Sequence, residues 1–515
     1  MTIEGVSGRT SYLGSSLLNI KTQLDTLTQQ LASGKKSTTY SGLGLDSAFA
    51  TGLRSQISML SGYQNTQTNV TTRINVANLS LQGLVDMRTQ VQSAATGASQ
   101  VLNANGQTSG QQIGYASFTQ AISLLNTQSG DRYLFSGRAT DTPSTAAADD
   151  ILNGADGKDG LKAVIADRLI ADQGTGNMGR LTTDATTTPG VVTVGEDANP
   201  SPFGLKLSRI STSINGAVVT QPATAGPPTP SSETIDLNAA TPKEGDTVIF
   251  TFTLPDQTTE TVQLTATTAS PAPDGSFTID ADPTVTATNM KSALDSSIQT
   301  LVKGPMVAAS AMAAGQNFFD NPPQRVGGGS PVSPTATTLV DGSATTVQWY
   351  TGEQLGNPDA DARNTAVAQV DGSVSVSYGA TANESAFRNL LQNMAVYAAV
   401  TTTVDPNDPN GQNLANAQIS ALNERVNANL AVQPGTTSVE DIEAQFAGAQ
   451  SATKSASTRQ TQTTSMAQTM LDQIQGVNDD EVAAKILALQ TSLQASYQTT
   501  ASLYQLSLVK YLPVG

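Results

Sequence analysis

The sequence predicts a mainly α-helical chain with a mixed α/β insertion. Long helices from the N- and C-terminal ends should pair as a coiled-coil bundle, with one or more β-rich outer domains inserted between them. Apolar residues recur at helical spacing over both ends of the 515-residue chain. The middle, residues 180–380, holds most of the 23 prolines and contains segments that alternate apolar and polar residues with period two.

The N-terminal helix is predicted from a heptad seam, in which apolar residues are spaced alternately four and three apart. The seam consists of Leu13, Leu17, Ile20, Leu24, Leu27 and Leu31. Gly34 follows it closely, as glycine commonly does after a helix C-terminus. Residues 37–46 then lack helical periodicity and read as a loop.

Further helices are predicted by the same apolar spacing on both sides of the insertion. Asn478 precedes three acidic residues and is the expected N-cap of the last helix. The predicted helices cover residues 53–103, 113–126, 411–431, 439–474 and 482–511.

The insertion contains one strong hairpin pattern. Residues 247–254 and 260–267 each alternate with period two, and the turn residues 255–258 separate them. The same reading adds a strand at 276–279 and an amphipathic helix at 286–302. Further strands are expected at 347–350 and 370–378, with proline- and glycine-rich connections at 220–232 and 320–338.

These patterns divide the chain into two helix-rich ends and a mixed β insertion between them, which differs from the ends in composition.

Composition excludes several function classes. The chain has no cysteine and no histidine, so it offers no disulfide, no thiolate or imidazole metal ligand and no Ser-His-Asp triad. A formal net charge of −16, with no basic run longer than Lys35-Lys36, argues against nucleic acid binding. No nucleophile, base or cofactor motif converges, so we expect neither an enzyme nor a cofactor or metal. No segment is apolar enough to span a membrane, and the first 31 residues do not read as a cleaved secretory signal.

The C-terminal helix is unusually poor in charge. Residues 482–515 contain only Lys485 and Lys510, with Gln, Ser and Thr at the polar positions. A surface helix normally carries charges on its wet face. An intramolecular bundle would account for the apolar seam, but the uncharged remainder favours burial by other copies or another protein. The predicted assembly residues are Leu13, Leu17, Ile20, Leu24, Leu27, Leu31, Ile486, Leu489, Leu493, Tyr497, Leu503 and Leu508.

Several segments resemble the flagellin family of bacterial flagellar axial proteins. Residues 31–36 (LASGKK) follow the leucine heptad as the family's "L-x-[ST]-G-[KR]" segment does, and Arg54 lies where the family begins its second helix. Residues 130–137 (GDRYLFSG), followed by 140–143 (TDTP), are similar to a segment of hook–filament junction proteins, also called hook-associated protein 3. The tail 493–508 looks like that subgroup too.

The resemblance covers residues 1–140 and 380–515 and implies a structural subunit of the extracellular flagellum, important for motility. It implies three nested layers. These are an inner terminal coiled coil around a central channel (1–46 and 476–515), a helical bundle (47–180 and 380–475) and a β-rich, surface-exposed insertion that projects outward (181–379). It also implies type III export without signal cleavage and a chaperone on the C-terminal helix. The implied partners are further copies in a helical polymer or ring, the hook or another junction protein, and filament flagellin.

Two alternatives stay open. In place of the family's Pro-Ser-Asp-Asp-type loop, the chain has residues 40–46 (YSGLGLD), and its insertion is long for a junction protein. Both features leave room for a major or minor flagellin of the filament itself. A secreted adhesin, with ligand recognition in the insertion, belongs to a different class. Trp349, the only tryptophan, would then mark either an exposed binding patch or a small core.

Overall fold

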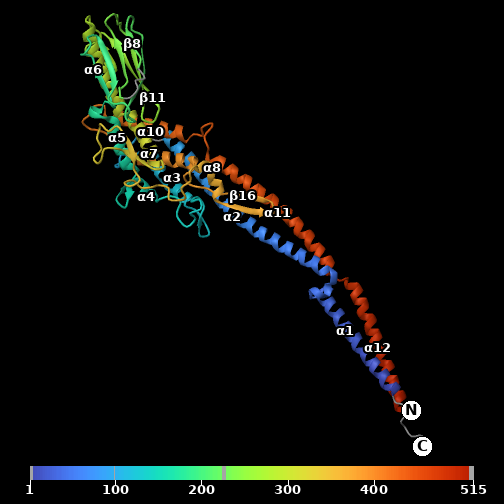
Figure 1. Ribbon diagram of the computed structural model, residues 1–515. Coiled ribbons are helices and arrows are strands. Elements are labelled where there is room, and N and C mark those ends of the chain that lie inside the picture. Colours follow the sequence, from blue (N-terminus) through green and yellow to red (C-terminus); the bar gives the residue numbers. More distant parts are fainter. Residues whose placement is uncertain (1–3, 98, 223–227, 510–515) are drawn as a thin grey trace. The chain divides into compact units, whose positions relative to one another are not determined.

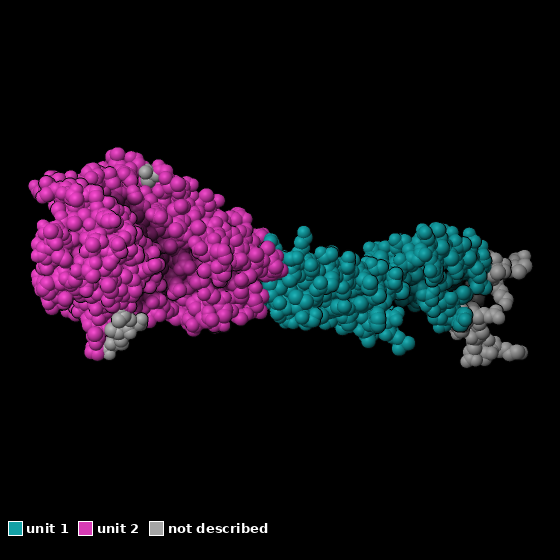
Figure 2. Space-filling model, turned by 90° about the horizontal axis from the view of Figure 1, so that it is seen from above, with its two compact units in different colours: residues 1–71, 368–376, 450–515 teal, residues 72–367, 377–449 magenta. Residues whose placement is uncertain are grey.

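The computed structural model describes residues 4–97, 99–222 and 228–509 (Figure 1). The chain divides into two units, coloured separately in Figure 2. Unit 1 comprises residues 1–71, 368–376 and 450–515, and unit 2 comprises residues 72–367 and 377–449. The coarse prediction is confirmed, because the chain is mainly helical and carries small, mostly antiparallel sheets between its helical ends.

Unit 1 consists of long helices from both ends of the sequence. Helix α1 and helix α12 lie side by side (Figure 1). A small core joins the start of α2 to the end of α11 through Ala50, Leu53, Ala467 and Leu471. The helical elements of this unit, two of which continue into unit 2, are α1 (Glu4–Ser33), η1 (Tyr40–Asp46), α2 (Ser47–Gly97), α11 (Val439–Gln475) and α12 (Asp479–Val509).

Two buried glutamines fix a short hairpin onto the helices of unit 1. The amide nitrogens of Gln67 and Gln460 both donate to the Val370 carbonyl, at 2.7 and 2.8 Å. Gln67 also donates to Gln460 Oε1 at 2.8 Å. The hairpin consists of β15 (Val367–Asp371) and β16 (Val374–Ser377). The sequence reading of one strand over 370–378 is therefore wrong, because Gly372 and Ser373 form a turn within it.

Unit 2 contains a helical part built around α7, which packs against α5, α9 and α10. Its capping chemistry is clearest at α3, where the Thr108 hydroxyl accepts from Gln111 N and the Gln111 side chain accepts from Thr108 N. The helices are α3 (Ser109–Leu125), α4 (Ala148–Asn153), α5 (Leu161–Gln173), η2 (Thr175–Asn177), α6 (Pro283–Lys303), α7 (Pro305–Phe319), α8 (Pro358–Asp361), η3 (Ala362–Thr365), α9 (Ser385–Ala399) and α10 (Gly411–Leu430).

Two four-stranded sheets share one core with α6, which contacts strands of both. The strand orders are β5-β6-β9-β8 and β12-β11-β10-β7. The strands are β5 (Leu181–Asp184), β6 (Val191–Glu196), β7 (Lys206–Thr212), β8 (Val218–Thr220), β9 (Ser232–Asp236), β10 (Thr247–Thr253), β11 (Thr259–Thr267) and β12 (Ser276–Thr278). Three short antiparallel pairs complete the unit. They are β1 (Gln128–Ser129) with β2 (Arg132–Tyr133), β3 (Gly154–Ala155) with β4 (Lys158–Asp159), and β13 (Gln324–Val326) with β14 (Leu339–Asp341).

The predicted hairpin of the insertion is confirmed. β10 and β11 pair antiparallel, with Phe250 opposite Val262, and the apolar residues of both strands face the shared core. β12 adds to β11 in parallel, and α6 matches the predicted amphipathic helix. Arg425 of α10 holds the hairpin turn through an ion pair with Asp256 at 2.6 Å.

Two sequence expectations are wrong. The helix expected to reach about residue 103 ends at Gly97, and Val101 beyond it is exposed. Residues 347–350 form no strand. There are only single bridges here, from Thr346 to Asp159 just before the run and from Tyr350 to Thr145 at its end. The run forms no strand because its aromatic side chains pack into a cluster with Phe319.

Glu233 of β9 gives unit 2 a pH-dependent stability. Its side chain is fully buried, and neither carboxylate oxygen has a hydrogen-bond partner in the described structure. Burial raises its pKa to about 7. The folded form therefore binds the proton more tightly than the unfolded form, and stability falls as pH rises from about 4.5 to about 7. The loss amounts to up to about 3 kcal/mol.

We expect Glu233→Gln to be more stable than the parent chain at pH 8 and nearly equal to it at pH 4.5. Denaturant unfolding followed by Trp349 fluorescence at several pH values measures this. Glu244→Gln is the control with the opposite expected effect on stability, because hydrogen bonds from Thr268 and Thr267 lower the pKa of that exposed carboxyl. It should lose stability at pH 8. An unchanged pH profile in Glu233→Gln would contradict the assignment.

Candidate assembly surface

The facing sides of α1 and α12 contain most of the residues singled out in the sequence. On α1, five predicted residues are half-buried, whereas Leu31 is exposed. On α12, Ile486, Leu489 and Leu493 are half-buried. The half-buried residues of α1 are Leu13, Leu17, Ile20, Leu24 and Leu27.

Beyond Leu493 the structure departs from the sequence list. The half-buried positions continue as Ser496 and Thr500, which keeps the alternating three- and four-residue spacing. Tyr497 lies off this line and is exposed, and Leu503, which continues the spacing after Thr500, is exposed as well. Leu508 lies within α12, but its side chain is outside the described residues. The prediction from the sequence chose the large apolar residues of this stretch. The three- and four-residue spacing that starts at Leu493 leads instead to the half-buried Ser496 and Thr500.

The helices also expose apolar side chains away from their contact. Tyr12 and Leu18 of α1 are 77% and 68% exposed, and Leu487 and Tyr504 of α12 are 64% and 63% exposed. Fully burying such a side chain is worth about 1.5–3 kcal/mol. Among the residues of unit 1 whose side chains are described, the exposed large apolar ones are Tyr12, Leu18, Leu31, Tyr40, Leu45, Phe49, Met59, Met466, Met470, Leu487, Tyr497, Leu503 and Tyr504.

Many of the hydroxyl side chains between them are hydrogen-bonded within their own helix. Residues 486–509 of α12 contain no charged residue at all. The hydroxyls of Thr491, Thr499 and Ser502 donate to the carbonyl four residues earlier, at 2.8–2.9 Å. Hydroxyls of α1, such as that of Thr22, do the same. A hydroxyl whose proton is already donated to its own helix is buried at a lower desolvation cost than a free one.

The first segment that resembles flagellins, residues 31–36, meets Arg54 where α1 ends and α12 begins. Gly34 has a φ of +63°, a left-handed conformation that glycine adopts freely. Lys36 N donates to the Gln475 carbonyl at 2.7 Å, and Arg54 donates to Gln475 Oε1 at 2.9 Å and to the Tyr40 hydroxyl at 2.7 Å. The LASGKK segment, the loop and Arg54 therefore form one joint. Gln475 was not singled out in the sequence, because one glutamine in a polar helix carries no distinguishing signal.

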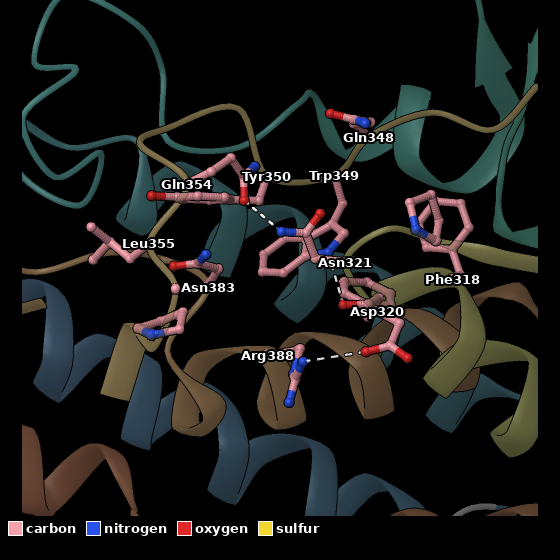
Figure 3. Close-up of a pocket in the computed structure, with 14 residues that line it drawn as sticks. Phe318, Asp320, Asn321, Gln348, Trp349, Tyr350, Gln354, Leu355, Asn383 and Arg388 are labelled. Atoms are coloured by element: carbon pink, nitrogen blue, oxygen red, sulfur yellow. Dashed lines mark hydrogen bonds and ion pairs between the residues drawn. The ribbon is translucent and has the colours of Figure 1, made fainter. Parts of the chain in front are cut away.

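The surroundings of Trp349 in the insertion do not support an exposed binding patch. A cavity of about 210 Å³ lies beside the tryptophan, and Figure 3 shows the residues that line this cavity. Trp349 is 4% exposed, donates from Nε1 to the Phe319 carbonyl at 3.2 Å and packs against the rings of Phe319 and Tyr350. Asn321 of the cavity donates to Gln354 at 2.6 Å and Arg388 pairs with Asp320 at 3.6 Å, whereas Asn383 Oδ1 has no hydrogen-bond partner in the described part of the chain. The tryptophan is therefore core.

Within the described ranges, no three acidic side chains gather in a way that could hold a metal ion. None of the described helices is long and apolar enough to cross a membrane. A scan against protein-family models finds no matching family, and a search of curated proteins finds no matching relative.

Proposed function

We propose that the chain is a structural subunit of the bacterial flagellum that polymerises through its terminal helices at the hook–filament junction. In this proposal α1 and α12 form a coiled coil in the assembled state, and neighbouring copies cover their remaining faces. The chain has no catalytic role, leaves the cell without signal cleavage and meets an export chaperone on α12. The motifs at both ends support the family, and the surface of unit 1 supports the mode of assembly.

One observation carries the proposal. Residues 486–509 form an uncharged helix whose exposed side includes Leu487, Leu503 and Tyr504. An apolar surface of this kind marks an interaction site. α1 covers only one line along α12, so the rest of the helix needs another copy or another flagellar subunit. At about 1.5 Å per residue, this uncharged part of α12 is roughly 36 Å long.

A filament flagellin is the second candidate. The 40–46 loop and the length of the insertion favour it, and it uses the same helical surfaces. Position in the flagellum and copy number distinguish the two. The adhesin alternative loses its main residue, because Trp349 is buried.

Trypsin provides a test that uses the chain's own lysines. In the purified monomer, we expect cleavage after Lys21 of α1 and Lys485 of α12, because both are exposed on helices with little packing. In sheared flagella both sites should be protected at least tenfold, because neighbouring copies bury the helices. Mass spectrometry of the fragments over time measures this.

Lys243 is the internal control for this experiment, because it lies in an exposed turn of unit 2 and should be cut equally in both samples. Equal cleavage at Lys21 and Lys485 in monomer and flagella would rule out assembly through these helices.

A further inference from the structure

Two arginines of unit 2 lie on one cavity without an acidic partner. Nearly every other described arginine of this unit forms an ion pair, as Arg88 does with Glu440 and Arg325 with Asp159 and Asp167. Within the described part of unit 2, only Arg73, Arg132 and Arg209 have none. The first two line the same cavity. The chain carries 42 acidic residues against 26 basic ones, so an unneutralised pair of guanidinium groups is notable.

The cavity has a volume of about 300 Å³. Arg73 comes from α2 and donates to the Tyr378 hydroxyl at 3.2 Å. Arg132 and Tyr133 come from β2, within the GDRYLFSG segment. Arg138, at the end of the same segment, also lines the cavity and is held by Glu353 at 2.8 Å. No aspartate or glutamate lines the cavity, so its wall is cationic.

The remaining wall supplies hydroxyls and an apolar floor. The Tyr133, Tyr378 and Thr140 side chains border the cavity, and Phe446 closes it from α11. Guanidinium groups bind carboxylates and phosphates through two parallel N–H bonds, and hydroxyls add single donors. Ligand pockets commonly have volumes of about 300–1,000 Å³, so this cavity accommodates only a small molecule. Because two like charges on one wall repel each other, an anion between them stabilises the folded unit.

We propose that this cavity binds a small oxyanion, which is a carboxylate or phosphate group on a molecule no larger than one sugar ring. Arg73 and Arg132 are its charge partners, and Tyr133 and Tyr378 border its body. The inference does not depend on the assembly proposal, because every residue of the cavity belongs to unit 2 and the site is present in the monomer.

Isothermal titration calorimetry on the full monomeric chain tests the proposal at constant ionic strength. The probes are glucuronate, inorganic phosphate and neutral glucose. We expect glucuronate or phosphate to bind with one site per chain, and glucose not to bind. A response to glucuronate alone identifies a carboxylate ligand, and a response to phosphate alone identifies a phosphate ligand.

The variants Arg73→Gln and Arg132→Gln should each weaken anion binding at least tenfold, because each removes a charged donor. Arg132 is exposed, so its replacement leaves folding intact. Arg209→Gln is the matched control: it removes an arginine that is also unpaired but lies on β7, away from the cavity, and should bind normally. Absence of saturable binding of both anions, equal binding of glucose, or equal loss in Arg209→Gln would refute the site.

Discussion

Replacing Leu487 by aspartate is expected to abolish assembly while leaving unit 2 folded. Leu487 is largely exposed on the uncharged part of α12, so its replacement removes no packing within the monomer. In an assembly, the change removes about 1.5–3 kcal/mol of apolar burial per copy. It also buries a carboxylate without a partner, which costs more. Leu489→Asp is less informative, because Leu489 is half-buried and packing within the monomer would change too.

The experiment is complementation of cells that lack the chain. Cells that produce Leu487→Asp should be non-motile and should release the variant into the medium as a monomer with native Trp349 fluorescence. Val218→Asp is the matched control, because Val218 is similarly exposed but lies on β8 of the insertion. It should restore motility. Full motility with Leu487→Asp would contradict assembly through this surface of α12.

Asp172→Ala is expected to destabilise unit 2 by about 3–5 kcal/mol. Asp172 is fully buried and accepts from Arg168 Nε at 2.9 Å, Ser310 Oγ at 2.7 Å and Gly204 N at 2.9 Å. These groups come from α5, α7 and the segment before β7. Removing the carboxylate leaves the buried guanidinium of Arg168 without its counter-charge, which is far more costly than losing a surface pair.

Urea unfolding followed by Trp349 fluorescence measures the effect, since the chain has a single tryptophan and it lies in unit 2. The control is Arg388→Ala, which removes a partly exposed ion pair with Asp320 of 3.6 Å. It should cost less than about 1 kcal/mol. A loss of similar size in both variants would mean that the Asp172 network contributes no more than a surface pair.

The parts of the fold that the sequence predicted well are those with a clear period. The alternation in residues 247–254 and 260–267 predicted β10 and β11, because one face of that sheet is buried and the other meets solvent. The long helices were found for a similar reason. α11 and α12 each keep a stripe of apolar residues and a polar remainder.

Of the helices that were missed, α7 lacks such a stripe, because it is buried on most sides and apolar residues surround it. α9 does carry one, since Phe387, Leu390, Leu391 and Met394 recur at helical spacing, so its sequence signal was overlooked. The proline at the start of α7, directly after Gly304, reads as a connection in sequence but is the first residue of the helix. The short strands of the first sheet also escaped, because three to six residues give too little alternation to recognise.

The candidate site was predictable only in part. Spacing identified the half-buried residues of α1 and the first three of α12. Which apolar residues stay exposed depends on the rotation of each helix against its neighbour, and a list of leucines and tyrosines does not contain that rotation. The cavity of Arg73 and Arg132 was not predictable either, because its walls come from segments about 300 residues apart in sequence.

Immunogold electron microscopy on sheared flagella, with an antibody that recognises residues 181–379, tests the central claim most directly. The account predicts gold at the hook-proximal end of the filament and nowhere else. Gold along the whole filament would contradict the junction assignment and favour a filament flagellin. Flagella without any gold, from cells that produce the chain, would contradict the flagellar proposal as a whole.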